Sequence, residues 1–220
     1  MTRLVLFDLD GTLVDSSPGI HASVRVAATH LGLPEPTPDQ LRGMVGPPLQ
    51  DGFALVLGVP VRDVPRAVAA YRAHYTAGAL LDVTVHDGIP ELLAALRDGG
   101  ATLAVATSKP EPFAVRVLEH TALLPYFAGV HGATLDGTVR HKDQVVGTAL
   151  AAHPAGRDPV LIGDRAHDVL GAAAHGLPCI GAGWGPAEDG ELVAAGAAAV
   201  AATPADVLAL MCEGGGLRGI

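Results

Sequence analysis

The opening apolar run and the two aspartates that follow it constrain the fold more than any other part of the chain. Leu4 to Phe7 form a continuous apolar run, which is typical of a strand buried on both faces of a parallel sheet. The run ends at Asp8, Asp10 follows two residues later, and Gly11-Thr12 turns the chain. Ligands bind beyond the carboxyl ends of the strands in such a sheet, so both carboxylates are candidates for a functional site. A solvated turn is the alternative, because Asp and Gly are common turn residues.

Composition and charge exclude several classes of protein. Hydrophobic residues make up 49% and charged residues 17% of the 220 residues, which suits a folded chain with a substantial core. The formal net charge of −9 argues against binding to nucleic-acid polymers, because such proteins need a basic surface. It does not exclude small phosphorylated substrates, since a bound metal ion supplies positive charge locally.

Neither membrane insertion nor cysteine chemistry is indicated. The sequence contains no basic-then-apolar leader and no long uncharged apolar run, so we expect a cytoplasmic protein that has no membrane partner. Cys179 and Cys212 are its two cysteines, and neither belongs to a Cys-x-x-Cys pair. We therefore expect neither a disulfide framework nor a zinc site.

A helical insert is predicted after the opening strand. Ser17 is expected to cap its first helix, in which apolar residues recur at helical spacing. Residues 39–81 continue as helical pieces, which Gly46-Pro47-Pro48 and Gly58-Val59-Pro60 interrupt. No strand-like run separates these pieces. The insert therefore resembles a small domain of its own, placed between the first strand and the next α/β unit.

From residue 82 onward, apolar runs alternate with helical patterns. The strands predicted after the first are residues 102–106, 126–131, 159–162, 178–180 and 198–200. This alternation predicts an α/β fold whose core is a doubly wound, Rossmann-like parallel sheet. The core is expected at residues 1–14 and 83–220, and the small α-helical cap domain at residues 15–82. The C-terminal Gly214–Gly216 is expected to be frayed.

Polar residues at the predicted strand ends and helix starts form one candidate site. They are Asp8, Asp10, Thr107, Ser108, Lys142, Asp164 and Asp168. The strand ends of a doubly wound sheet converge on one edge. Carboxylates packed together repel one another and need a cation, and a few oxygen ligands suit Mg²⁺, which keeps several waters and bridges to phosphate. A hydroxyl and a lysine add donors for phosphate oxygens, so the set predicts a phosphoryl-transfer site.

Four ordered motifs resemble those of the haloacid dehalogenase superfamily. The motifs are Asp8-Leu-Asp10-Gly-Thr-Leu-Val-Asp15, Ala106-Thr107-Ser108-Lys109, Lys142 and Gly163-Asp164-Arg-Ala-His-Asp168. The resemblance covers essentially the whole chain, and the helical insert is similar to the small cap of that superfamily. Finer stretches resemble its phosphoglycolate-phosphatase-like branch, and within it the 5′-nucleotidase-like group. Those stretches are Val45-Gly-Pro-Pro-Leu49, Thr107-Ser-Lys-Pro110, Leu135-Asp-Gly-Thr138 and Ile162-Gly-Asp-Arg-Ala-His-Asp168.

The resemblance implies a catalytic role for four residues. Asp8 would be the nucleophile and form an aspartyl-phosphate that water later hydrolyses. Asp10 would protonate the leaving oxygen and then deprotonate the attacking water. Thr107 would donate a hydrogen bond to the phosphoryl oxygens, and Lys142 would bridge the nucleophile and the phosphate. Without the resemblance, Thr107 is equally a helix-capping hydroxyl and Lys142 an ordinary solvent-facing lysine.

The resemblance also implies metal and substrate ligands. Mg²⁺ would be held by the carboxylates of Asp8 and Asp164 and by the backbone carbonyl of Asp10. Asp168 would orient these ligands without binding the ion, or would partly share it. The residues expected to bind substrate are Gly11, Thr107, Ser108 and Lys142 in the core, and Arg42 and Arg72 in the cap. Both cap arginines could equally be ordinary helix-surface charges.

Five further residues have less defined expectations. Lys109 is expected to be solvated or near the entrance, and His141 to lie on the surface rather than to act as a ligand. His167 has about equal claims to lie near the substrate or on the surface. Trp184 is expected to pack on the core rather than wall the pocket. Arg165 stands where many relatives have Ser, and the sequence alone assigns it no role.

The sequence therefore predicts a Mg²⁺-dependent phosphomonoester hydrolase with a mobile helical cap. Its substrate is expected to be a small phosphorylated metabolite, a nucleoside monophosphate or phosphoglycolate, and its state a monomer or homodimer. Asp10 favours a phosphate ester, because relatives that cleave C–halogen or P–C bonds lack this residue. A sugar phosphomutase on the same scaffold is the alternative enzyme. A receiver-like switch is a further alternative, and Asp10 argues against it, because a general base would shorten the life of a phospho-aspartate.

Overall fold

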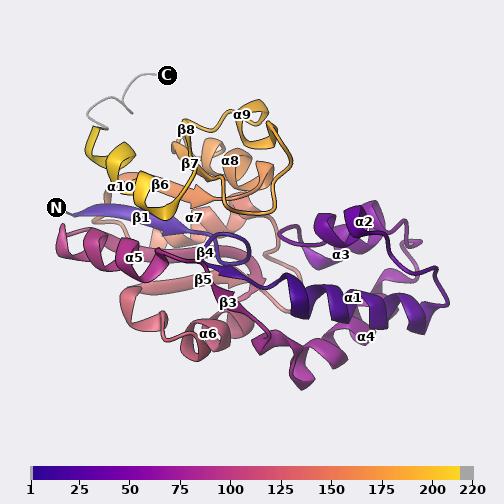
Figure 1. Ribbon diagram of the computed structural model, residues 1–220. Coiled ribbons are helices and arrows are strands. Elements are labelled where there is room, and N and C mark those ends of the chain that lie inside the picture. Colours follow the sequence, from indigo (N-terminus) through magenta and orange to yellow (C-terminus); the bar gives the residue numbers. More distant parts are fainter. Residues whose placement is uncertain (1, 214–220) are drawn as a thin grey trace.

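A six-stranded parallel sheet forms the centre of the core, and the opening strand lies in its interior (Figure 1). The structure is a computed structural model that describes residues 2–213. Neighbouring strands follow the order β5-β4-β1-β6-β7-β8 and all pair in parallel. These strands are β1 (Arg3–Phe7), β4 (Thr102–Pro110), β5 (Gly129–Ala133), β6 (Arg157–Gly163), β7 (Cys179–Ala182) and β8 (Ala199–Ala201). The glycine-rich tail predicted to fray lies outside the described residues.

Helices cover both faces of the sheet, which explains the unbroken apolar run of β1. Val5 and Phe7 belong to the core cluster on one face, whereas Leu4 and Leu6 belong to the cluster on the other. The first face is covered by α5 (Ile89–Asp98), α6 (Glu111–His120) and α10 (Pro204–Glu213), and the second by α7 (Lys142–Ala152), α8 (Ala166–Ala173) and α9 (Glu191–Ala194). A short 3₁₀ turn, η3 (Leu124–Tyr126), leads into β5. The predicted doubly wound α/β fold is therefore confirmed.

A helical insertion follows β1 and lies beside the strand ends (Figure 1). Its elements are α1 (Ser17–Leu31), α2 (Pro38–Gly43), α3 (Leu49–Asp51), the π-helical η1 (Gly52–Val56), α4 (Val64–Ala77) and the 3₁₀ turn η2 (Ala79–Leu81). Helices α1 and α4 pack against each other and form the most extensive contact within the insertion. Among the described residues, no helix has the length and apolar character needed to cross a membrane.

An antiparallel ribbon of β2 (Val14–Asp15) and β3 (Thr84–Val85) connects the core to the insertion. We did not predict it, because two residues per strand are too few to show an alternating pattern. β2 spans the expected boundary between residues 14 and 15, and β3 lies just after the one between residues 82 and 83. The division into residues 1–14, 15–82 and 83–220 stays a proposal.

The start of α1 differs from the expectation. Ser17 is the first helical residue rather than the cap, and Ser16 occupies the N-cap position without a side-chain capping bond. The carboxylate of Asp15 instead accepts hydrogen bonds from the backbone N–H of Ser17, at 2.9 Å, and from its hydroxyl. The anionic group at this helix start is therefore supplied from the ribbon.

Strand bounds also differ from the expectation at two places. β4 continues to Pro110, although the polar residues after Ala106 suggested that it ends there. β5 begins at Gly129, because the preceding apolar residues form the 3₁₀ turn η3. Polar residues extend β4 because its end lies under the insertion and is buried through Lys109.

The contact between α1 and η2 depends on Gly19. A Cβ atom there would lie 1.9 Å from the carbonyl oxygen of Ala79. Gly19→Ala is therefore expected to lower the free energy of unfolding by about 1–3 kcal/mol, the usual cost of overpacking. Val26→Ala is the matched control on the same helix, because 40% of Val26 is exposed. Urea denaturation measures both variants, and equal midpoints would show that α1 and η2 separate without cost.

Candidate active site

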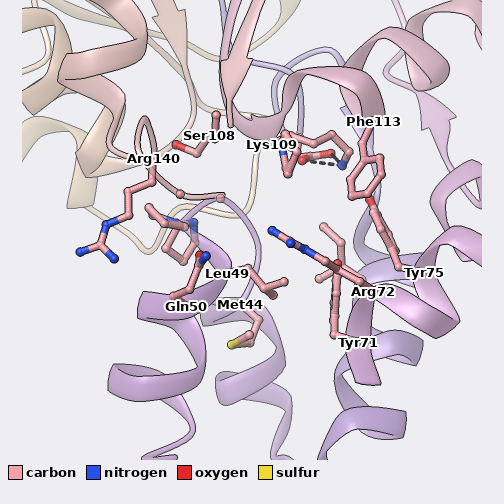
Figure 2. A pocket seen from close by; sticks show the side chains of 18 of the residues that line it. Met44, Leu49, Gln50, Tyr71, Arg72, Tyr75, Ser108, Lys109, Phe113 and Arg140 are labelled. Atoms are coloured by element: carbon pink, nitrogen blue, oxygen red, sulfur yellow. Dashed lines mark hydrogen bonds and ion pairs between the residues drawn. The ribbon is translucent and has the colours of Figure 1, made fainter. Parts of the chain in front are cut away.

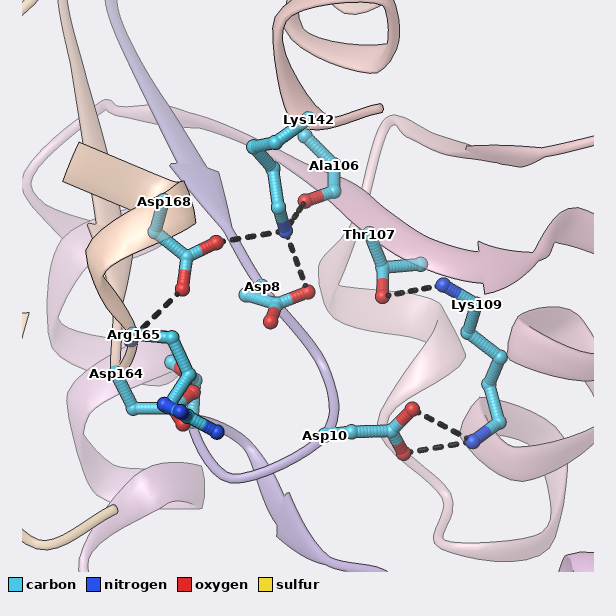
Figure 3. Close-up of polar contacts among 10 residues, drawn as sticks. Asp8, Asp10, Ala106, Thr107, Lys109, Lys142, Asp164, Arg165 and Asp168 are labelled. Carbon is cyan, nitrogen blue, oxygen red and sulfur yellow. Dashed lines mark hydrogen bonds and ion pairs between the residues drawn. The ribbon is translucent and has the colours of Figure 1, made fainter. Parts of the chain in front are cut away.

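The carboxyl ends of β1, β4 and β6 bring three of the predicted residues into one buried cluster (Figure 3). Asp8 directly follows β1, Thr107 lies in β4 and Asp164 directly follows β6. The backbone N–H of Asp8 donates to the carbonyl of Ile162 at 2.9 Å, so the pairing of β1 with β6 continues past the strand. Each of these three residues is at most 2% exposed. The cluster lies where ligands bind in open α/β sheets.

Lys142, the first residue of α7, lies at the centre of this cluster (Figure 3). Its ammonium contacts Asp8 Oδ1 at 2.8 Å and Asp168 Oδ1 at 2.7 Å, and donates to the carbonyl of Ala106 at 2.9 Å. Three contacts match the three N–H donors of a lysine. A Cβ atom at residue 171 would lie 2.5 Å from Lys142 Cγ, so Gly171 provides the space through which Lys142 reaches inward.

Burial and charge act in opposite directions on these groups. Burial alone would lower the pKa of Lys142, but Asp168 and Asp8 outweigh it and raise this pKa. Burial raises the pKa of Asp8 to about 6, even though Lys142 opposes the change. Burial would also raise the pKa of Asp168, but Lys142 outweighs it and this pKa is lowered. Asp168 therefore stays ionised and holds Lys142, whereas any further positive charge nearby would favour the ionised form of Asp8.

Asp168 is fixed in turn by the start of α8. Its Oδ2 accepts a hydrogen bond from the backbone N–H of Arg165 at 3.0 Å. A Cβ atom at residue 163 would lie 2.4 Å from Asp168 Cγ, so the carboxylate packs directly on the backbone of Gly163. The position of Lys142 therefore depends on the chain conformation between β6 and α8.

Asp164 is tightly enclosed, and only one of its oxygens has a hydrogen-bond partner among the described residues. Thr12 Oγ1 donates to Oδ1 at 2.5 Å, whereas Oδ2 is buried and unpaired. Gly11 has a φ of +90°, and a Cβ atom there would lie 2.4 Å from Oδ2. Burial, Asp168 and Asp8 together raise the pKa of Asp164 well above its ordinary value. An unpaired buried carboxylate oxygen is costly, so this donor set fits a hard divalent cation.

A second group of ligand atoms lies beside the first. Asp8, His167 and Asp168 each offer one atom, and these atoms lie within 4.8 Å of one another. Burial lowers the pKa of His167 to about 4, so its imidazole is neutral, as metal binding requires. However, Lys142 already supplies positive charge to both carboxylates. The imidazole also packs on the insertion, where a Cβ atom at Gly46 would lie 3.3 Å from Nε2. This group is therefore the weaker cation site.

Lys109 was expected to be solvated or near the entrance, and it is buried in the lining of the pocket rather than solvated. Its side chain is 3% exposed, and its Nζ lies 2.7 Å from each carboxylate oxygen of Asp10 (Figure 3). Its Nζ also lies 5.2 Å from the ring centroid of Tyr75, which belongs to α4 of the insertion. Side chains two residues apart in a strand share a face, and this alternation from Thr107 is the sequence signal for an inward-facing Lys109. We missed it because the predicted strand ended at residue 106.

A pocket lies next to Asp10, between the core and the insertion (Figure 2). Its lining includes the rings of Tyr71 and Tyr75 from α4, whose centroids lie 5.0 Å apart. The ring of Phe113 from α6 lies 6.2 Å from that of Tyr75. Ser108 also lines the pocket, and its buried hydroxyl has no partner among the described residues. The hydroxyl of Tyr75 is likewise buried and unpaired within the described residues. Next to the predicted chemistry, the pocket thus offers aromatic faces and two unpaired hydroxyls.

The two cap arginines lie in different environments. Arg72 lines the pocket and points into it (Figure 2). Its Nη1 donates to the carbonyl of Leu135 at 3.1 Å, and its buried Nε is unpaired within the described part of the chain. Arg42 pairs with Asp39 on an exposed part of α2 and is not among the residues that line the pocket.

Arg165 and Trp184 connect the site to its surroundings. Arg165 Nε contacts Glu191 Oε1 at 2.9 Å, and its Nη1 donates to the carbonyl of Val45 in the insertion at 2.8 Å. Trp184 packs on the core, as expected, and its Nε1 donates to the carbonyl of Thr12 at 3.0 Å. Neither residue lines the pocket. Arg165 therefore joins the chain segment after Asp164 to the insertion.

His141 and Thr107 complete the set of predicted residues. The side chain of His141 is 47% exposed and lies 3.7 Å from Asp51, in keeping with the expected surface position. Thr107 Oγ1 accepts a hydrogen bond from the backbone N–H of Lys109 at 3.2 Å. The structure thus brings all the predicted core residues together and leaves Arg42 outside.

Comparison with known proteins assigns the family. The model of the haloacid dehalogenase-like hydrolases matches residues 5–182. The tyrosine-protein kinase PtkA of Mycobacterium tuberculosis is 45% identical over 185 residues, which cover 83% of this chain but only 62% of that protein. The 5′-nucleotidase of Pseudomonas aeruginosa is 42% identical over 189 residues, which cover 86% of each protein.

A solved structure extends the similarity to the fold of the whole chain. It is described as a predicted phosphatase from Clostridium acetobutylicum, and it superimposes with a TM-score of 0.92 at 35% identity. The match covers 97% of this chain and 99% of that one. With its buried aspartate cluster at the strand ends and its helical insertion after β1, the chain belongs to the haloacid dehalogenase-like hydrolases.

Proposed function

We propose that this protein is a phosphatase that hydrolyses monoesters of small phosphorylated metabolites with Mg²⁺, through an aspartyl-phosphate on Asp8. The observation that supports this most directly is the buried ammonium of Lys142, 2.8 Å from Asp8. It holds the carboxylate in place and provides positive charge where a phosphate dianion would approach. A carboxylate is a weak nucleophile toward an anion, so that charge is the first requirement of the reaction.

In the first half-reaction, a carboxylate oxygen of Asp8 bonds to phosphorus while the bond from phosphorus to the leaving oxygen breaks. A proton on the carboxyl group of Asp10 moves to the leaving oxygen, so that an alcohol departs. The hydroxyls of Thr107 and Ser108 donate hydrogen bonds to the phosphoryl oxygens. Ser108 supports this role because its buried hydroxyl has no partner in the described chain.

In the second half-reaction, water attacks phosphorus and gives its proton to the carboxylate of Asp10. The bond between phosphorus and the Asp8 oxygen breaks, which frees the nucleophile and releases inorganic phosphate. Gly11 was predicted to bind substrate, but its backbone N–H donates to the carbonyl of Val14 at 2.8 Å, so we assign this N–H no role toward the phosphoryl group. The insertion covers Asp10, since 10% of that side chain is exposed, and would keep other water out.

Mg²⁺ is proposed to lie between Asp8 and Asp164, with the backbone carbonyl of Asp10 as a third ligand. The unpaired Oδ2 of Asp164 supports this placement. When bound, the ion would neutralise phosphate charge and polarise the phosphoryl oxygens. Thr12 orients Asp164 through its hydrogen bond to the other oxygen, and Asp168 acts through Lys142 rather than as a ligand.

For the substrate, a nucleoside 5′-monophosphate is favoured over phosphoglycolate. The rings of Tyr71, Tyr75 and Phe113 in the pocket offer flat apolar faces for a nucleobase. The similarity to a 5′-nucleotidase over 86% of both chains supports the same substrate class. Arg72, with its unpaired Nε, is the observation that favours phosphoglycolate, because its guanidinium suits a carboxylate.

A phosphotransferase that acts on tyrosine is the second candidate function. The 45% identity with PtkA favours it, although that name belongs to a longer protein. Transfer to a phenol would use the same aspartyl-phosphate, with a tyrosine hydroxyl in place of the water. The sugar phosphomutase expected as an alternative from the sequence differs only in returning the phosphoryl group to a sugar.

Phosphate release from a panel of esters tests the proposal. The panel contains nucleoside 5′- and 3′-monophosphates, phosphoglycolate, hexose phosphates and an aryl phosphate, each with Mg²⁺ and with chelator. We expect the highest kcat/KM for a nucleoside 5′-monophosphate, and loss of release in chelator, because the carboxylate cluster needs a cation. Hexose phosphate isomerisation without phosphate release would indicate the mutase instead, and label transfer from ATP to a tyrosine peptide would indicate the kinase.

Asp8→Asn tests the nucleophile through activity and through stability. Turnover should fall at least about 1,000-fold, because an amide cannot accept the phosphoryl group. Without metal, the raised pKa of Asp8, about 6, means that the contribution of Asp8 to wild-type stability falls as pH rises from about 4 to about 7. Asn carries no such charge, so the variant should be more stable than wild type in chelator, increasingly so over that pH range. Denaturation at both ends of the range measures this, and a constant difference would contradict the assigned shift.

Paired variants test the position of the cation. Mg²⁺ should raise the melting temperature of the wild type, since ligand that binds only the folded state stabilises it by about 2.7 kcal/mol at 100 times Kd. Asp164→Asn should abolish most of this shift, whereas His167→Gln should retain it. The reverse pattern would place the ion in the group of Asp8, His167 and Asp168.

A further inference from the structure

The proposed reaction gives no role to Lys109, although this residue forms a buried ion pair in the pocket. Its ammonium lies 2.7 Å from Asp10 Oδ1 and 2.7 Å from Asp10 Oδ2. The side chains are 3% and 10% exposed, respectively. A buried ammonium loses its hydration, and this loss must be offset by a partner held in good geometry. The pair is therefore a buried ion pair with a defined geometry and not a surface ion pair.

The contact includes the insertion as well as the core. The ring centroid of Tyr75 in α4 lies 5.2 Å from Lys109 Nζ, a distance at which an aromatic face attracts a cation. Lys109 comes from β4 and Asp10 from the turn after β1. Three elements that are far apart in sequence thus meet at the ammonium of Lys109, which pairs with the carboxylate proposed to handle the proton (Figure 3).

We propose that Lys109 is a positioning residue, which orients the carboxyl group of Asp10 toward the leaving oxygen of the substrate. Tyr75, on the insertion, holds the ammonium of Lys109 through its ring. This inference rests on the proposed function. When the carboxyl group carries the proton, one oxygen accepts from Lys109 and the other presents its proton to the leaving oxygen. After transfer, both oxygens of the carboxylate face Lys109, as they do in the structure.

The physical gain is orientation. A carboxyl group on a free side chain samples many rotations about its terminal bond, and only some direct a proton at the leaving oxygen. Bonds to both oxygens hold one rotation. Misplacement of a reacting group by about 1 Å costs up to about 100-fold in rate, so loss of the lysine should affect proton transfer before it affects phosphate binding.

The leaving group provides the test. Departure of an alkoxide from a nucleoside monophosphate needs a proton, whereas departure of 4-nitrophenolate from its phosphate ester does not. The quantity compared is kcat/KM, because it covers only the steps through leaving-group departure and omits hydrolysis of the aspartyl-phosphate that both substrates share. Lys109→Met removes the charge and keeps the apolar stem.

We expect Lys109→Met to lower kcat/KM for the nucleoside monophosphate by about 10- to 100-fold, and for 4-nitrophenyl phosphate by less than about threefold. Lys109→Arg should recover part of the loss, because a guanidinium also binds both oxygens of a carboxylate. Arg140→Met is the matched control. It removes another positive charge that lines the same pocket, and it should lower both values equally or leave them unchanged.

Two outcomes separate this inference from the function on which it rests. If Asp10→Asn shows the leaving-group difference and Lys109→Met lowers both substrates equally, Lys109 binds phosphate or supports the fold, and the inference is wrong. If Asp10→Asn itself shows no difference, the proposed role of Asp10 fails first. If Lys109→Met melts below the assay temperature, Lys109→Gln replaces it. Its side-chain amide still donates hydrogen bonds, and we expect the same difference between the two substrates at a smaller size.

Discussion

One ammonium group determines the arrangement of the whole site. Lys142 holds Asp8 and Asp168 at 2.8 and 2.7 Å in a region from which water is excluded. Three carboxylates and one lysine leave the centre with excess negative charge, which adds to the effect of burial in raising the pKa of Asp8 and of Asp164. The fold tolerates the excess because a compact sheet and the start of α8 hold each group in place. The same excess is what a cation and a phosphate would together balance.

Much of this arrangement could be predicted from the sequence. The apolar run before Asp8 requires cover on both faces of a strand, and only a sheet with helices on both sides provides it. Once the strands are placed, their carboxyl ends must meet, and Asp164 must therefore lie beside Asp8. The roles of Lys142 and Asp168 came from the family resemblance, because neither helix spacing nor composition distinguishes a buried lysine from a solvated one.

The features that were missed share one physical cause, which is that tertiary contacts decide them. β2 and β3 are too short to show a pattern, and they form because the chain must cross twice between the core and the insertion. Lys109 is buried because α4 covers it with Tyr75, and nothing near residue 109 in the sequence indicates that cover. Arg42 and Arg72 are alike in sequence, but only Arg72 lies on the helix that faces the pocket.

Arg165 joins two parts of the molecule that are usually considered separately. Its backbone N–H is bonded to Asp168, and its guanidinium contacts both Glu191 and the carbonyl of Val45 in the insertion. It directly follows Asp164 in the chain. Thermodynamic linkage is reciprocal: to whatever extent an ion at Asp164 favours the contact with Val45, a closed insertion tightens the ion by the same factor. Occupancy of the metal position and closure over the substrate would then be a single equilibrium, which explains why an arginine suits a place where a serine would reach neither partner.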